Sequence, residues 1–152
     1  MFERMESRPA FTVLGLKYRG RNDQGEVPLL WEKLIPRAAE IQYKENEWES
    51  FGVMDHYDPG SGEFEYLAGY AVTSLADAPE DMTSWDIPDQ IYAVFRSTLA
   101  ELQELFHYAY QEWLPDSAFE RGPGPEFELY DPSFCEDETL YLYLPVIEKK
   151  QP

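Results

Sequence analysis

The pattern of hydrophobic and polar positions divides the chain into two similar series of elements. Residues 10–19 are apolar on both faces of an extended chain, which predicts an interior strand. Apolar residues recur every three or four positions over residues 27–43, which predicts a helix that kinks or restarts at Pro36. Residues 50–59 and 64–75 then have the composition of strands, and the turn residues PGSG between them predict a hairpin.

The second half of the chain repeats this order. Residues 90–97 predict a strand, and residues 98–115 have the most regular helical spacing in the chain, which Pro115 ends. Residues 125–131 and 139–147 predict a second hairpin. Each half of the chain therefore has the predicted order strand, helix, strand, strand.

Two segments between these elements are predicted to be loops. Residues 76–89, ADAPEDMTSWDIPD, are mostly polar and contain Trp85, an unusual loop residue that would suit a lid over a binding site. Residues 116–124, DSAFERGPG, are rich in turn-forming residues and lead from the second helix to the second hairpin.

The shared order of elements predicts a duplicated unit. The pseudo-repeats cover about residues 10–75 and 88–148 of a single domain, residues 1–152. The segment DHYDP in the first repeat is similar to ELYDP at the equivalent position of the second. The alternative is a chance match, because Asp-Pro is a common start of a turn. The duplication predicts an α+β fold: an antiparallel sheet with two helices on one face and a cleft at the pseudo-twofold junction.

A carboxylate in the middle of a strand is the main candidate for chemistry. In PEFELYDP, alternation places Glu126, Glu128 and Tyr130 on one face. In the last strand three leucines would face the helices, while Tyr141 and Tyr143 would join Glu128 on the other face. The alternative is an exposed strand glutamate beside a half-exposed tyrosine surface. The candidate ligand-binding residues are Glu128, Tyr130, Tyr141, Tyr143, Tyr66, Trp85 and Trp113.

The charge of the chain narrows its partners. The formal net charge of −18 disfavours nucleic acid and anionic membranes as partners, and it attracts a cationic small molecule or a basic protein. The alternative is that the acidic residues only maintain solubility. No stretch resembles a signal peptide or a membrane span, so we expect a soluble, cytoplasmic protein.

Motifs for cofactors and covalent chemistry do not appear in the sequence. Neither His56 nor His107 has the neighbours of a zinc site, and the GPGP segment lacks the N–H donors of a phosphate loop. Cys135 lies among acidic residues, which disfavours its thiolate. We therefore predict no cofactor, no metal and no catalytic residue, with one alternative: Glu128 as the acid or base of a hydrolase.

Several segments together resemble the GyrI-like, or AraC-type, effector-binding domain family. They are, in order, FTVLGLKY, LWEKL, FGV, FEYLAGYAV, IPDQIYAVF, YQEWLPDSAF, PEFELYDP and LYLYLPV. The resemblance covers nearly the whole chain and implies a cleft that binds hydrophobic, often cationic or aromatic, compounds. It also implies that Glu128, the glutamate of the FELY strand, lies at the floor of that cleft.

The resemblance leaves the use of this site open. Many family members carry a DNA-binding helix-turn-helix ahead of the domain, and a first strand near residue 10 predicts a stand-alone member without one. Relatives of this kind bind or sequester drugs, inhibit gyrase, or hydrolyse strained cyclopropane-type toxins. We expect a protein that binds aromatic or cationic compounds for drug sensing or sequestration. The alternatives are a hydrolase that uses the same glutamate and an acidic, gyrase-inhibitor-like module that binds a basic protein.

Overall fold

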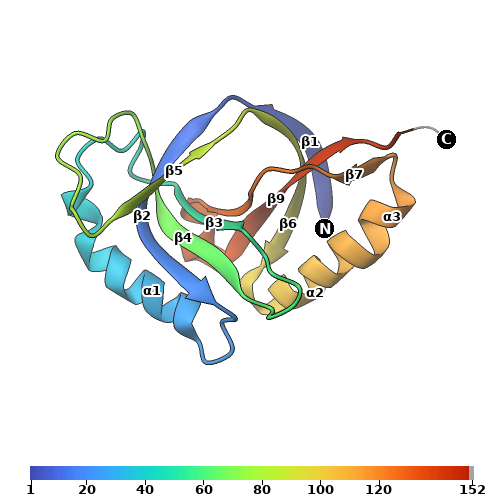
Figure 1. Cartoon of the computed structure of the whole chain (residues 1–152), viewed down its shortest axis with the longest axis horizontal. Coiled ribbons are helices and arrows are strands. Elements are labelled where there is room, and N and C mark those ends of the chain that lie inside the picture. Colours follow the sequence, from blue (N-terminus) through green and yellow to red (C-terminus); the bar gives the residue numbers. More distant parts are fainter. Residues whose placement is uncertain (151–152) are drawn as a thin grey trace.

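The computed structural model describes residues 1–150, which form an α+β fold around an antiparallel sheet (Figure 1). The main path of the sheet runs β1-β6-β9-β8-β3-β4-β2-β5, and β7 adds to β9. Strands β3 and β8 therefore meet at the centre, flanked on each side by a corresponding series. The strands are β1 Phe2–Arg8, β2 Phe11–Gly20, β3 Ser50–Asp55, β4 Phe64–Val72, β5 Thr83–Ile87, β6 Gln90–Thr98, β7 Phe119–Arg121, β8 Glu126–Tyr130 and β9 Thr139–Glu148.

Two helical stretches lie on the same side of the sheet, one toward each end (Figure 1). Leu34 of the first packs on β2 and β4, and Leu105 of the second packs on β6 and β9. The first changes from α to 3-10 geometry beside Pro36, where a kink was predicted. The helical segments are α1 Glu26–Leu34, η1 Ile35–Glu40, η2 Leu99–Glu101, α2 Leu102–Tyr108, the π-helical turn η3 Ala109–Trp113, α3 Leu114–Asp116 and α4 Pro132–Asp137. Over residues 1–150, none of these is both long and apolar enough to cross a membrane.

Two strands pair with partners far from their neighbours in the chain. Pro9 and Ala10 alone separate β1 from β2, and Pro88 and Asp89 alone separate β5 from β6. Proline has no N–H to donate to a ladder, so one strand ends and the next begins at each of these sites. Strand β1 then pairs with β6, and β5 pairs with β2. The segment β1–β2 and the segment β5–β6 both arch over the side of the sheet that faces away from the helices (Figure 1).

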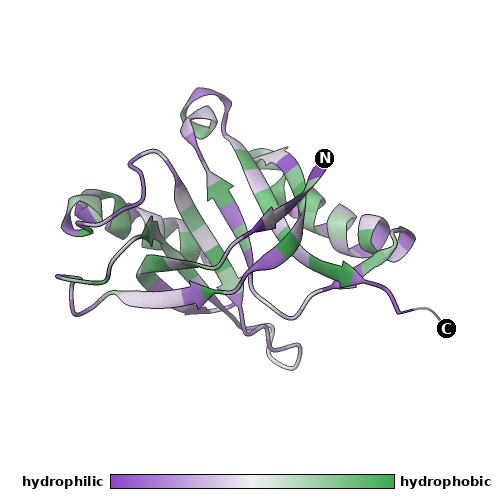
Figure 2. Cartoon of the chain, turned by 90° about the horizontal axis from the view of Figure 1, so that it is seen from above, coloured by the Kyte–Doolittle hydropathy of each residue, from purple (hydrophilic) through white to green (hydrophobic). Residues whose placement is uncertain are grey.

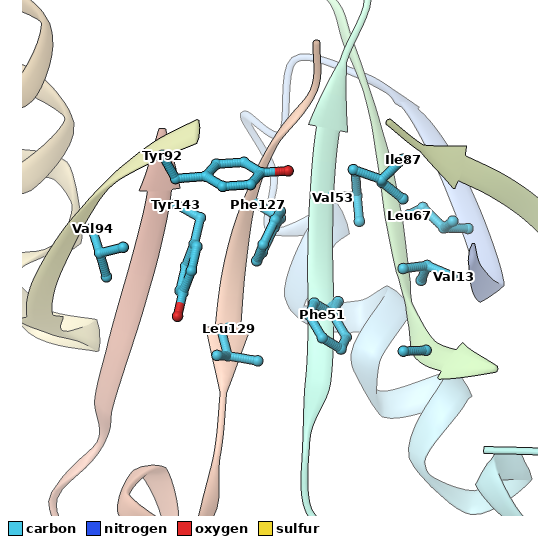
Figure 3. Packing of buried hydrophobic residues seen from close by; sticks show 11 residues of the cluster. Val13, Phe51, Val53, Leu67, Ile87, Tyr92, Val94, Phe127, Leu129 and Tyr143 are labelled. Atoms are coloured by element: carbon cyan, nitrogen blue, oxygen red, sulfur yellow. The ribbon is translucent and has the colours of Figure 1, made fainter. Parts of the chain in front are cut away.

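A core of aromatic and branched side chains fills the space under this arch (Figure 3). The rings of Phe127 and Tyr143 stack with centroids 4.7 Å apart, and the Tyr92 ring meets both at its edge. The guanidinium of Arg8, at the end of β1, lies 5.5 Å from the Phe127 ring and 5.1 Å from the Phe11 ring. Cation–π attraction therefore helps to hold β1 against β2 and β8.

Four elements were not predicted. Strands β5 and β7 lie in segments that were predicted to be loops, and no element was predicted for the residues of β1 and α4. The polar residues of β5 hid its alternation: Ser84 and Asp86 face solvent, while Trp85 packs on the core beneath. Such alternation of hydrophobic and hydrophilic residues is visible along the strands in Figure 2. Helix α4 starts because the Asp131 side chain caps the N–H of Ser133, at 2.9 Å.

Candidate functional site

Strand β8 places two glutamates and a tyrosine on the side of the sheet that carries the helices. Glu128 pairs across the sheet with Leu142 on one side and Gly52 on the other. Leu142 packs against the α2 helix, so Glu128 shares the helix-covered face. The side chain is buried: only 5% of Glu128 is exposed.

A glycine in the neighbouring strand leaves space for this carboxylate to be bound. A Cβ atom at Gly52 would collide with the phenol oxygen of Tyr66 and would lie 2.8 Å from Glu128 Oε1. Without it, the Tyr66 side chain reaches from β4 across β3 to β8. The site therefore requires glycine at position 52 because there is no space for a side chain. The conformational freedom of glycine is not the reason.

Two phenols donate hydrogen bonds to the same carboxylate oxygen. Tyr66 and Tyr130 each place their hydroxyl oxygen 2.8 Å from Glu128 Oε1. Trp31 of α1 donates its indole N–H to the Tyr66 oxygen at 2.9 Å, and its ring meets the Tyr130 ring in a T-shaped contact at 5.5 Å. A chain of donors thus runs from helix α1 to the carboxylate, and such linked hydrogen bonds strengthen one another.

In the described part of the chain, the side chains that donate hydrogen bonds to Glu128 are the two phenols. Over residues 1–150, no lysine, arginine or histidine forms an ion pair with it. Burial raises the pKa of Glu128 to about 6, while the bonds from Tyr66 and Tyr130 oppose this rise and nearby Glu126 adds to it. Burial also raises the pKa of both tyrosines, which remain neutral donors at physiological pH.

Glu128 should make the stability of the unliganded protein depend on pH. Its pKa is about 6 when folded against an ordinary value of 4.5, so the folded state binds the proton more tightly. Its contribution is therefore fully present below pH 4.5 and is lost as the pH rises through 6. We expect Glu128→Gln to be more stable than wild type by about 2 kcal/mol at pH 8 and by less than about 0.5 kcal/mol at pH 4.5.

Urea denaturation of both proteins across this pH range measures the difference. Other titrating groups cancel between wild type and variant, so the comparison isolates Glu128. A difference that stays constant from pH 4.5 to 8 would contradict a raised pKa at this residue.

The structure brings together some of the predicted site residues and separates others. Glu128, Tyr130 and Tyr66 meet in one hydrogen-bonded group. The prediction that Tyr141 and Tyr143 share the face of Glu128 is wrong. Tyr141 pairs with Leu129 and Tyr143 with Phe127, so both tyrosines lie on the opposite face, under the arch.

The two predicted tryptophans lie away from Glu128. Trp85 was expected in a loop, but it belongs to β5 and packs against the core under the arch. Trp113 ends the π-helical turn and stacks on the Phe2 ring, 5.1 Å away, and on the Phe119 ring. Both tryptophans are therefore packing residues in this structure.

Sequence reasoning missed Trp31 and Gly52. Trp31 lies within the predicted helix of residues 27–43, and no local pattern shows which strand a helical side chain will cover. Gly52 had a weak signal, since a glycine inside a strand often marks a close approach of other atoms. The side chain that approaches Gly52 is that of Tyr66, which lies two strands away from Glu128 in the sheet. Only the order of the strands reveals this.

Two surface hollows lie along the second helical stretch. The larger, of about 460 Å³, is lined by Met1, Gln103, Glu104, His107, Tyr108 and Glu112. The smaller, of about 270 Å³, lies beside Trp113 and Asp116. Glu128 lines neither of these two hollows.

Comparison with known proteins gives a consistent set of matches. The family model described as "Cass2: Integron-associated effector binding protein" matches residues 4–146. The transcriptional regulator BrlR of Pseudomonas aeruginosa is 34% identical in an alignment 152 positions long that covers 96% of this chain. The chain spans 56% of the length of that regulator.

Solved structures share the fold. The protein SAV2435, bound to tetraphenylphosphonium, matches with a TM-score of 0.75 and 19% identity, over 97% of this chain and 94% of its own. An integron cassette protein from Vibrio cholerae matches with a TM-score of 0.67 and 15% identity, over 95% of each chain. A hydrolase from Listeria innocua matches with a TM-score of 0.58 and 10% identity, over 95% of this chain and 90% of its own.

Proposed function

Because this chain belongs to the Cass2 family of integron-associated effector-binding proteins, we propose that it binds hydrophobic aromatic cations with Glu128 as the anionic anchor. The family match also bears out the predicted resemblance to effector-binding proteins. Small-molecule binding follows from the family, and the class of ligand and the role of Glu128 are our proposal. The biological role of the protein would then be to sense or sequester such compounds.

One observation carries the proposal: Glu128 is a buried carboxylate whose hydrogen-bond donors within residues 1–150 are all hydroxyl groups. A buried charge is costly unless a charge of opposite sign approaches it. A ligand cation can supply that charge, and the rings of Trp31 and Tyr130 would add cation–π attraction to it. The tetraphenylphosphonium bound by SAV2435 is a compound of this class.

The arrangement of the sheet supports a site at its centre. Strands β8 and β3 lie in the middle of the sheet order, and the series β9-β6-β1 and β4-β2-β5 flank them. We infer a duplicated unit from this order, with about residues 10–75 and 88–148 as its halves in one domain. Glu128 would then lie near the junction of the halves, with one helical stretch to each side.

A pair of ions of equal shape and opposite charge tests the proposal. Tetraphenylphosphonium and tetraphenylborate both present four phenyl rings around one central atom. At pH 8, where Glu128 is ionised, calorimetric titration of the wild-type protein should show binding of the cation and at least 100-fold weaker binding of the anion. Equal binding of both ions, or binding of neither, would contradict the proposal.

A further inference from the structure

A second, largely buried carboxylate lies beside Glu128 on the same strand face. Glu126 is two residues earlier in β8, so its Cα lies about 7 Å from that of Glu128. Its side chain is 13% exposed, and across the sheet it pairs with Met54. Sequence reasoning placed Glu126 on this face without assigning it a role, and the proposed function does not use it.

The hydrogen bond and the ion pair of Glu126 both involve the same carboxylate oxygen, Oε1. Tyr110 donates its hydroxyl to Oε1 at 2.6 Å, and a guanidinium nitrogen of Arg121 lies 3.5 Å from the same oxygen. The other oxygen, Oε2, is fully buried and has no hydrogen-bond donor within the described part of the chain. A buried carboxylate oxygen without a donor is unfavourable, and in native proteins such an atom calls for an explanation.

Neither neighbour is free to turn toward Oε2. Arg121 donates through Nη1 to the carbonyl oxygens of Gly122 and Gly124, the latter at 2.7 Å, and through Nε to Tyr110 at 3.1 Å. Tyr110 belongs to the π-helical turn of residues 109–113, a type of helical irregularity that is frequent at functional sites. The fixed pair therefore orients Glu126 and leaves Oε2 able to accept a donor from outside residues 1–150.

We propose that Glu126 Oε2 accepts a hydrogen bond from an N–H group of the ligand, so that the site selects aromatic cations bearing amine N–H groups. The inference rests on the proposed function, because it requires a ligand at Glu128. Two carboxylates and one guanidinium leave a single net negative charge. One ligand cation satisfies that charge, and one further N–H donor satisfies Oε2.

Two acridine dyes test this selection. Proflavine and acridine orange share the same cationic three-ring system, but proflavine carries NH₂ groups where acridine orange carries dimethylamino groups. Fluorescence anisotropy at pH 7.5 should show that wild type binds proflavine about tenfold more tightly than acridine orange. Glu126→Gln keeps an oxygen for Tyr110 and puts an NH₂ donor in place of Oε2, so the preference should fall about tenfold, to near equality.

Three further results separate this inference from the proposed function. Glu128→Gln should weaken both dyes alike and leave their ratio unchanged. Equal binding of the two dyes by wild type, or a preference that survives in Glu126→Gln, would overturn the inference alone. Failure of wild type to bind either dye would overturn both.

Acridine orange also reports whether the variant site is intact, since its binding does not require Oε2. If Glu126→Gln does not bind it, Glu126→Asp replaces it in the test. That variant keeps the charge and withdraws the carboxylate by one methylene group, so the same fall in preference is expected. An unchanged preference in Glu126→Asp would then overturn the inference.

Discussion

Replacing Glu128 by glutamine is expected to weaken the binding of tetraphenylphosphonium by about 2–4 kcal/mol, or about 30- to 1000-fold. Glutamine has nearly the same shape, and its side-chain oxygen can still accept the hydroxyls of Tyr66 and Tyr130. The variant therefore loses the charge while the packing stays. Isothermal titration calorimetry at pH 8, above the pKa of about 6, measures the full effect.

Glu63→Gln is the matched control for this experiment. It makes the same change of charge on a side chain that is 46% exposed, and it should change affinity by less than about twofold because solvent screens an exposed charge. Mass spectrometry of the ligand recovered after binding would show whether the protein has altered it chemically. Equal affinity of wild type and Glu128→Gln would mean that another group holds the cation.

Replacing Gly52 by alanine is expected to damage both the fold and the site. The added methyl group would collide with the Tyr66 phenol and crowd Glu128 Oε1, and β3 cannot retreat because it is bonded to β4 and β8 on its two sides. Forcing a methyl group into a packed interior costs about 1–3 kcal/mol, and displacing Tyr66 would remove one of the two donors to a buried carboxylate. We expect a total loss of stability of about 2–4 kcal/mol.

Urea denaturation and titration with tetraphenylphosphonium measure the two effects of Gly52→Ala. Gly60→Ala is the control, since a methyl group there would meet only an Asp58 oxygen at 3.2 Å, within a turn. It should remain within about 0.5 kcal/mol of wild type, as most surface substitutions do. A Gly52→Ala protein of wild-type stability and affinity would show that Tyr66 need not cross β3 to hold Glu128.

The regular parts of the fold could be predicted because their signals are local. The helix of residues 98–115 and both central hairpins were found from periodicity and turn residues, and they lie within a few residues of the structure. Strands β1 and β5 escaped prediction for a physical reason. Each lies at an end of the sheet, so one face carries polar residues that give the segment the composition of a loop.

Glu128 could be chosen from the sequence, but its surroundings could be predicted only in part. Alternation within β8 correctly placed Tyr130 beside it, because that relation involves one strand. The tyrosines of the last strand were correctly assigned to the face away from the helices, but Glu128 was wrongly placed with them, because that relation depends on the register between β8 and β9. A shift of one residue in that register exchanges every side chain between the two faces, and neither strand encodes it alone.

The sequence by itself determined that this is an acidic α+β domain with a carboxylate set among tyrosines in mid-strand, because charge, periodicity and alternation are properties of neighbouring residues. The tertiary structure alone decided that this carboxylate is buried and that Trp31 and Tyr66 join it from two other elements. It also decided that one oxygen of a second glutamate has no donor among residues 1–150. Those features depend on which strands pair and which helix covers them. They arise from contacts between residues far apart in the chain.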